Sequence, residues 1–427
     1  MTSSTTAHTS EKTEPQNKTH EARYDVVLYG ATSFVGQITA RYLSAFLTAQ
    51  PDSKARIALA GRDADNLKKL QQTLQTATDI IIADSNDTDS LATMVKQTRL
   101  IISTVGPYLR YGAPLVAACA EHGTDYIDLT GETLFIKDMM DAHGDTAKES
   151  GARIVHCCGF DSTPSDLGVY FTQARAKEAF GAVCQQIQMR VVEAKGGISG
   201  GTIASMTTLF AEASKDPKRR RQLGNPYLLN NDANPPSIKQ QNVTKPRYDH
   251  EHEHWVAPFV MASINTRVVH RSNQLQDYAY GRDFLYDEAT WMADGIKGQV
   301  QSYGMSAGLL GLTTALSFAR SRDFLSKHIL PKAGSGPSKD AQEAGHYTLR
   351  FFGQTAAGKT LTTEVTGDKD PGYGSTARML AQSALCLLDV PKSDVGGGFW
   401  TPASAMGEAL IERLEAHAGL SFHVLDA

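Results

Sequence analysis

Short apolar runs alternate with segments of helical periodicity through the first third of the chain. Between the runs, segments such as 34–49 and 113–123 repeat apolar residues every three or four positions, as amphipathic helices do. Apolar strands that alternate with helices form parallel sheets covered on both faces. The pattern predicts an N-terminal α/β domain with a doubly wound, Rossmann-type parallel sheet. Its six strands are expected within residues 24–30, 55–62, 78–85, 99–107, 125–132 and 152–161.

The alternation of short strands and helices ends at about residue 167, where longer segments of mixed pattern begin. Residues 345–368 place two β-patterned arms around the turn "TAAGK", which predicts a hairpin. Helix-like segments at 374–388 and 401–417 close the chain. We therefore predict four parts: a disordered polar tail (1–22), a Rossmann domain (23–166), an α+β domain for substrate binding and dimerisation (167–366), and a C-terminal helical segment that packs back on the domains (367–427).

Composition excludes several classes of protein. The 427 residues exceed the usual single domain of about 100–200 residues, and a formal charge of −4 gives no electrostatic footprint for nucleic acid. An odd number of cysteines without a C-x-x-C pair argues against a disulfide framework or structural zinc. The alternating histidines of "DHEHEH" (249–254) lie in a loop-rich stretch without further ligands, so no metal site is expected. A reducing, cytoplasmic location fits the free cysteines and the absence of an apolar secretion signal in residues 1–22.

The low-charge apolar stretch from Ser302 to Phe318 is too short for the roughly 20 apolar residues that a membrane crossing needs. We expect it to be a helix buried in the second domain or at a subunit interface. Contact with a membrane surface or an acyl chain is the alternative.

The stretch "YGATSFVG" (29–36) follows the first strand and opens the first helix. Such a turn brings backbone amides against a pyrophosphate at a helix N-terminus, where unpaired N–H groups favour anions. Gly30 lets the chain leave the strand and Gly36 lets the helix approach the sheet, while Ser33 replaces a middle glycine. A plain strand-to-helix turn is the alternative, but the position within a six-strand alternation favours dinucleotide binding. The predicted contacts are Gly30, Thr32, Ser33, Phe34, Val35 and Gly36.

The end of the second strand favours NADP over NAD. An NAD site usually has a carboxylate there for the ribose, whereas "ALAGRD" places Gly61 and Arg62 before Asp63. Arg62 can hold a 2′-phosphate, and Asp63 keeps NAD open as the alternative. The fourth strand ends in "STVGPY", which adds Thr104, Val105, Gly106 and Tyr108 to the predicted cofactor contacts.

The block "GFDSTPSDLG" (159–168) follows the sixth strand at the carboxyl edge of the sheet, where open α/β sheets bind ligands. It concentrates acids and hydroxyls, although the same residues also suit a helix entry. If the block is catalytic, one group protonates the carbon opposite the hydride or polarises a conjugated carbonyl. The candidate catalytic residues are Asp161, Ser162 and Asp166.

Together these motifs resemble the saccharopine dehydrogenase-like oxidoreductases, in the branch of the trans-acting enoyl reductases. The resemblance runs from about Tyr24 to the C-terminus and rests on "YGATSFVG", "ALAGR", "STVGPY", "YIDLTGE", "HCCGFDSTPSDLG", "SGGTIAS", "GDKDPGYGSTARMLAQSALCLL" and "GGFWTPASAMGEALIERL". It implies a Rossmann NADP-binding domain, a second domain with a mixed sheet, a homodimer, and reduction of a carbon–carbon double bond in a lipid-like precursor.

Three functions remain open at this stage. The first is an NADPH-dependent reductase of an apolar, acyl-like small molecule. The second is an amino-acid dehydrogenase, which needs arginines such as Arg190, Arg267 and Arg271 to converge on substrate carboxylates. The third is a non-catalytic NADP-binding protein that associates with lipid or membrane surfaces through residues 302–318.

Overall fold

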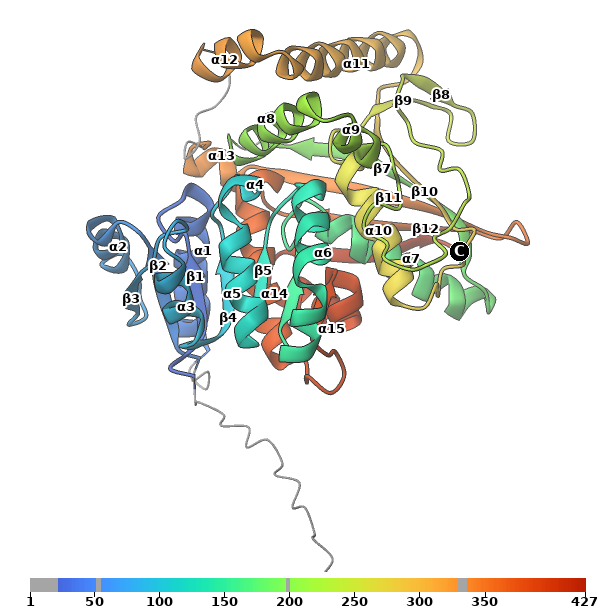
Figure 1. The fold of residues 1–427 in the computed structure, drawn as a ribbon. Coiled ribbons are helices and arrows are strands. Elements are labelled where there is room, and N and C mark those ends of the chain that lie inside the picture. The colour runs from blue at the N-terminus through green and yellow to red at the C-terminus, as the bar shows by residue number, and fades with distance from the viewer. Residues whose placement is uncertain (1–21, 51–54, 197–199, 329–335) are drawn as a thin grey trace, which may run out of the picture.

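Two seven-stranded sheets organise the chain (Figure 1). The computed structural model describes residues 22–50, 55–196, 200–328 and 336–427, so nearly all of the expected tail lies outside the described residues. The first sheet is parallel throughout, which confirms the predicted fold class. In spatial order it contains β13 (Gly398–Trp400), β6 (Arg153–Val155), β5 (Asp125–Asp128), β4 (Thr98–Ser103), β1 (Tyr24–Tyr29), β2 (Ile57–Gly61) and β3 (Asp79–Ile82). Its helices are α1 (Phe34–Ala49), α2 (Ala64–Gln71), α3 (Thr88–Val95), α4 (Tyr108–Tyr111), α5 (Ala113–His122) and α6 (Thr133–Ser150).

The second sheet is mixed, because β10 runs parallel to β7 while the other pairs are antiparallel. The predicted hairpin is confirmed: β11 and β12 pair on either side of residues 355–359. The spatial order is β14 (Leu420–Asp426), β12 (Thr360–Gly367), β11 (His346–Thr355), β7 (Cys184–Lys195), β10 (Leu285–Trp291), β9 (His254–Pro258) and β8 (Arg247–Asp249).

The remaining helices lie around and between the sheets (Figure 1). They are α7 (Thr163–Phe180), α8 (Gly200–Lys215), α9 (Pro217–Leu223), α10 (Ala262–Leu275), α11 (Gly295–Ser317), α12 (Ala319–His328), α13 (Lys339–Glu343), the π-helical turn η1 (Pro371–Ser375), α14 (Thr376–Asp389) and α15 (Pro402–His417).

The C-terminal segment joins the two sheets. It was predicted to be helical, but it also contains two strands. It supplies β13 to the first sheet and β14 to the second. Helix α14, which precedes both strands in the chain, contacts α1, β4 and α15. One hydrophobic cluster runs from Val26 on β1 through Leu380 on α14 to Phe351 on β11. The cofactor edge of the first sheet is thereby held at a defined position relative to the second sheet.

Helix α11 lies on the outside of the molecule together with α12, so it is not buried within the second domain, which was one of its two expected places (Figure 1). Ile296 is 81% exposed, Leu310 68% and Phe318 65%. Apolar residues surround this helix on all sides, so packing against α8 and β9 covers only part of them. Among the described residues, no helix is long and apolar enough to cross a membrane.

Gly168, on α7, leaves no room for a side chain. A Cβ there would lie 2.1 Å from Cζ of Phe351, whose ring is fully buried. We expect Gly168→Ala to lower the free energy of unfolding by about 1–3 kcal/mol, because the added methyl group overpacks the core. Urea denaturation measures this change. Gly144→Ala on α6 is the control: its Cβ meets nothing within 4 Å, and it should raise stability by about 0.5–1 kcal/mol. Equal effects of the two changes would contradict this packing.

Candidate active site

The glycine turn after β1 packs directly on the segment that follows β4. Gly30 has a φ of +82°, and a Cβ there would lie 2.6 Å from Val105 Cγ2 and 2.7 Å from Thr104 Oγ1. A Cβ on Gly36 would lie 2.3 Å from the carbonyl oxygen of Gly30. Both positions therefore require glycine, one for its backbone angle and both for lack of space.

Ser33 is the N-cap of α1. Its hydroxyl accepts a hydrogen bond from the Gly36 amide at 3.0 Å and lies 2.9 Å from Thr104 Oγ1. Within the described part of the chain, the amides of Phe34 and Val35 have no acceptor, and the first turn of α1 contains no acid. Unpaired amides at a helix N-terminus are an anion site, so this turn suits a cofactor pyrophosphate.

Arg62 and Asp63, at the end of β2, have separate roles. The Asp63 carboxylate caps α2, because it accepts the amides of Asp65 at 3.1 Å and Asn66 at 3.0 Å. Arg62 is exposed and makes no hydrogen bond or ion pair with any described residue. The guanidinium is thus free for a 2′-phosphate, while the neighbouring acid is occupied.

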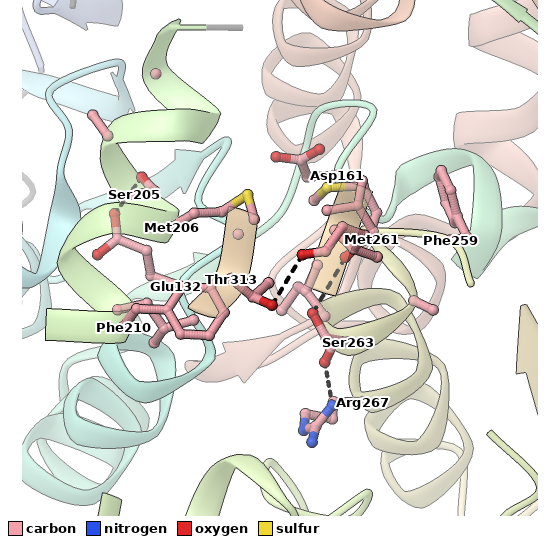
Figure 2. A pocket seen from close by; sticks show the side chains of 18 of the residues that line it. Glu132, Asp161, Ser205, Met206, Phe210, Phe259, Met261, Ser263, Arg267 and Thr313 are labelled. Carbon is pink, nitrogen blue, oxygen red and sulfur yellow. Dashed lines mark hydrogen bonds between the residues drawn. The ribbon is translucent and has the colours of Figure 1, made fainter. Parts of the chain in front are cut away.

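A cavity of about 730 Å³ lies between the two halves of the chain, within the usual size of ligand sites. Its walls come from the N-terminus of α1, the segments after β4 and β5, α8, the start of α10, and α11. Figure 2 shows Met206, Phe210, Phe259 and Met261 beside the few polar groups. The walls are therefore mostly apolar, and the inner side of α11 supplies Leu309 and Thr313.

Two of the three carboxyls that line the cavity are held by hydrogen bonds. Glu132 accepts the amides of Tyr108 at 2.8 Å and Leu109 at 2.9 Å and the Ser205 hydroxyl at 2.6 Å, which ties α4 to α8. Glu288 accepts from Tyr286 Oη at 2.8 Å and Asn265 Nδ2 at 2.9 Å. Burial raises the pKa of Glu132, and it raises the pKa of Glu288 to about 7.

Asp161 is the third cavity carboxyl and differs from the other two. It accepts no hydrogen bond from any described residue. Burial alone raises its pKa to about 7. A carboxyl with no donor to stabilise its charge can hold a proton near neutral pH and release it into the cavity.

Ser162 and Asp166 do not line this cavity. The Ser162 hydroxyl donates to Asn265 Oδ1 at 2.9 Å, and its backbone has a φ of +107°, which is rare for a residue other than glycine. Asp166 accepts from the Ser272 hydroxyl and from the Ala403 amide, at 2.8 Å for the latter. These two residues connect α7 to α10 and α15.

Comparisons with known proteins agree with this geometry. Residues 26–155 match the saccharopine dehydrogenase NADP binding domain family. A Mycobacterium tuberculosis protein provisionally named a trans-acting enoyl reductase is 42% identical over 93% of this chain and 96% of its own. Trans-acting enoyl reductase of Mycobacterium leprae is 40% identical over 92% of this chain and 95% of its own. The chain belongs to the trans-acting enoyl reductase family.

The chain also shares its fold with a protein of solved structure. Apo saccharopine dehydrogenase (L-Glu forming) from Saccharomyces cerevisiae superposes with a TM-score of 0.52, covering 94% of this chain and all of the other, at 13% identity. At that identity the likeness concerns the fold alone.

Membership of the family and the NADP-binding domain make the chain an NADP-dependent oxidoreductase, and the cofactor is NADP(H). The turn after β1 and the free Arg62 fit that cofactor. The predicted contacts that also line the cavity are Ser33, Phe34, Val35, Thr104, Gly106 and Tyr108, whereas Gly30, Thr32, Gly36, Arg62 and Val105 lie outside its lining.

Sequence reasoning missed several cavity groups of this family member. Glu132 was part of a quoted motif without an assigned role, while Ser205 and Glu288 had no role assigned. Arg267 was named only as one of three arginines that an amino-acid dehydrogenase would need for substrate carboxylates. Their only signal in the sequence is a polar residue within an apolar segment, which many structural residues share.

We expect Arg62→Ala to raise the dissociation constant for NADPH by about 10- to 100-fold, the usual loss of a hydrogen bond to a charged group, and to change that for NADH little. Nicotinamide fluorescence on titration with each cofactor measures both constants. Arg41→Ala, which removes another exposed arginine, is the control. Equal weakening of NADPH and NADH would contradict the 2′-phosphate assignment.

Proposed function

We propose that this protein reduces the double bond of an apolar acyl substrate with NADPH, inside the cavity between its two sheets. The observation that carries the proposal is Asp161, a carboxyl with a raised pKa in an apolar cavity that the cofactor turn also lines. The names of the relatives as enoyl reductases support the same reaction.

The reduction adds one hydride and one proton across the double bond. Bound NADPH supplies the hydride in such a reaction. We assign the proton to the carboxyl of Asp161, because the other cavity acids are committed. Glu132 holds α4 to α8 through three hydrogen bonds, and Glu288 is bonded to Tyr286 and Asn265. The apolar walls exclude water, so the proton of Asp161 is not lost to solvent. The same walls favour binding of an apolar acyl chain.

An amino-acid dehydrogenase has less support. Such an enzyme needs arginines that converge on substrate carboxylates. Arg190 is instead paired with Asp287 at 2.7 Å and Asp249 at 3.1 Å. Arg271 donates to Asn231, Gln274 and the Phe399 carbonyl, and it does not line the large cavity. Of these three arginines, only Arg267 lines it.

Association with a lipid surface is a second function, and the outer face of α11 favours it. Ile296, Val300 and Tyr303 are each more than half exposed, although they are apolar. The opposite side of the same helix lines the cavity through Leu309 and Thr313. Docking of this face on a membrane would bring the cavity close to an acyl substrate held there. A homodimer, expected from the family resemblance, would compete for the same face.

The reductase proposal is tested by mixing purified protein and NADPH with a panel of α,β-unsaturated acyl thioesters. Loss of NADPH absorbance with formation of the saturated thioester is the expected result. Tight NADPH binding without oxidation by any member of a panel that spans short and long chains would overturn the proposal for acyl substrates.

Asp161→Asn is expected to lower kcat by about 10²- to 10⁴-fold, the range for loss of a general acid, with NADPH affinity unchanged. Because the acid must be protonated, the wild-type kcat should fall as pH rises through about 7, the pKa of Asp161. The variant should lose that dependence.

Asp166→Asn is the comparison, since burial also raises the pKa of Asp166 to about 7. This carboxylate bonds Ser272 and Ala403, so its variant should lower the melting temperature and keep the pH dependence of kcat. The assignment is wrong if Asp166→Asn, and not Asp161→Asn, removes the dependence on pH.

The lipid-surface role predicts that Ile296→Gln combined with Val300→Gln lowers flotation with phosphatidylcholine–phosphatidylglycerol vesicles by at least about tenfold, because each side chain loses apolar burial. NADPH oxidation with a short, water-soluble thioester should not change. Ile82→Gln, a 52% exposed position on β3, is the control. Unchanged flotation contradicts the role, and loss of a dimer in the double variant assigns the face to a second copy.

A further inference from the structure

One buried cation in the cavity wall has no counterion among the described residues. Arg267 lies on α10, is 7% exposed and lines the cavity, where Figure 2 shows it beside Ser263. Its guanidinium donates to two backbone carbonyls, those of Ser263 and Leu223. Its Nε–H is buried and has no acceptor. Arg267 makes no ion pair with any carboxylate in the part of the chain that the structure describes.

The other buried arginines are satisfied within the protein. Arg153 pairs with Asp125 at 2.6 Å, and Arg190 pairs with Asp249 and Asp287. Arg271 has three oxygen acceptors. Burial lowers the pKa of both Arg267 and Arg271 to about 10, but Asp232 opposes the shift of Arg271, whereas no neighbouring acid opposes that of Arg267.

An unpaired charge is costly to bury, and two carbonyl acceptors offset only part of that cost. The guanidinium keeps free donors in a planar fork that matches an oxyanion. In addition, α10 begins at the cavity without a side-chain cap, so its N-terminal dipole adds positive potential there. A negative group on the ligand would complement both the Arg267 guanidinium and the N-terminus of α10.

Two exposed arginines lie on the short helix whose last residue is bonded to Arg267. That residue, Leu223, ends α9 and also lines the cavity. On α9, Arg220 and Arg221 are exposed and form no ion pair with the described residues. Exposed cations on an element that lines a cavity attract anions toward it and raise their rate of entry.

We propose that Arg267 binds an oxyanion carried by the acyl substrate, and that Arg220 and Arg221 guide this group to the cavity. The oxyanion is a phosphate on the arm that carries the acyl thioester or the carboxylate of a free acid. The inference rests on the proposed function for the acyl chain, whereas the anion site itself is a property of the cavity. Arg267 is a binding residue, remote in role from the proton donor Asp161.

The test is equilibrium binding to the NADP⁺-loaded protein by calorimetry, with no turnover in the readout. Two pairs of probes differ only in the anion: 4′-phosphopantetheine against pantetheine, and dodecanoate against dodecanol. The wild type should bind the charged member of one pair about tenfold or more tightly than its neutral partner, as one charge-assisted contact allows. Arg267→Met should remove that preference and leave binding of the neutral probe unchanged.

Arg267→Lys keeps the charge and should retain part of the preference, which separates loss of charge from loss of folding. Arg271→Met, another buried arginine outside the cavity lining, should retain all of it. A preference for phosphopantetheine identifies a carrier arm, and a preference for dodecanoate identifies a free acid. If the wild type binds the charged and neutral members of both pairs equally well, the proposal is overturned, whatever the variants do.

The result also separates this inference from the proposed function. A preference that depends on Arg267, in a protein that reduces no enoyl thioester, supports the anion site and rejects the reductase. Reduction of thioesters without any such preference rejects the anion site alone.

Discussion

The shared hydrophobic core between the two sheets is the constraint on which the rest of this structure depends. Helix α14 is buried on nearly all sides, and its apolar residues belong to the hydrophobic cluster that spans both sheets. Because β13 and β14 follow it in the chain and join different sheets, the C-terminal segment connects both sheets. Polar contacts complete the junction, with Asp166 bonded to Ser272 and Ala403 and Glu132 bonded to Ser205. The cofactor edge therefore faces a preformed cavity.

The chemistry of that cavity follows from how its few charges are compensated. Glu132 and Glu288 are acids bonded to donors, so they support the walls. Among the residues that the structure describes, Asp161 has no donor and Arg267 has no acid partner, so each is available to a ligand. In a low-dielectric site such groups act more strongly than they would in water. An acyl chain between a proton donor and an anion-binding residue accounts for both, and it also explains why most of the remaining wall is apolar.

Local sequence patterns predicted the first domain well, because its strands and helices differ in hydrophobic periodicity. In addition, its cofactor turn requires glycine at positions 30 and 36. They could not predict β13, three residues long, since its pairing depends on a distant partner. Ser162 and Asp166 adjoin Asp161 in sequence, yet α7 begins there and sends successive side chains in different directions. Arg267 could not be assigned, because a free and a paired arginine look alike until the fold places their neighbours. The stretch 302–318 was expected in the second domain or at a subunit interface, because its uniform apolarity specifies no particular buried face.

The most direct test of the central claim, hydride transfer to an acyl double bond in this cavity, is to follow the hydride itself. The protein would be incubated with NADPH deuterated at the transferred position and an α,β-unsaturated acyl thioester, and the product analysed by mass spectrometry. The account predicts a saturated thioester with one deuterium on carbon, and a second when the reaction is run in heavy water. A saturated product without deuterium from NADPH, or an unchanged thioester beside oxidised cofactor, would contradict it.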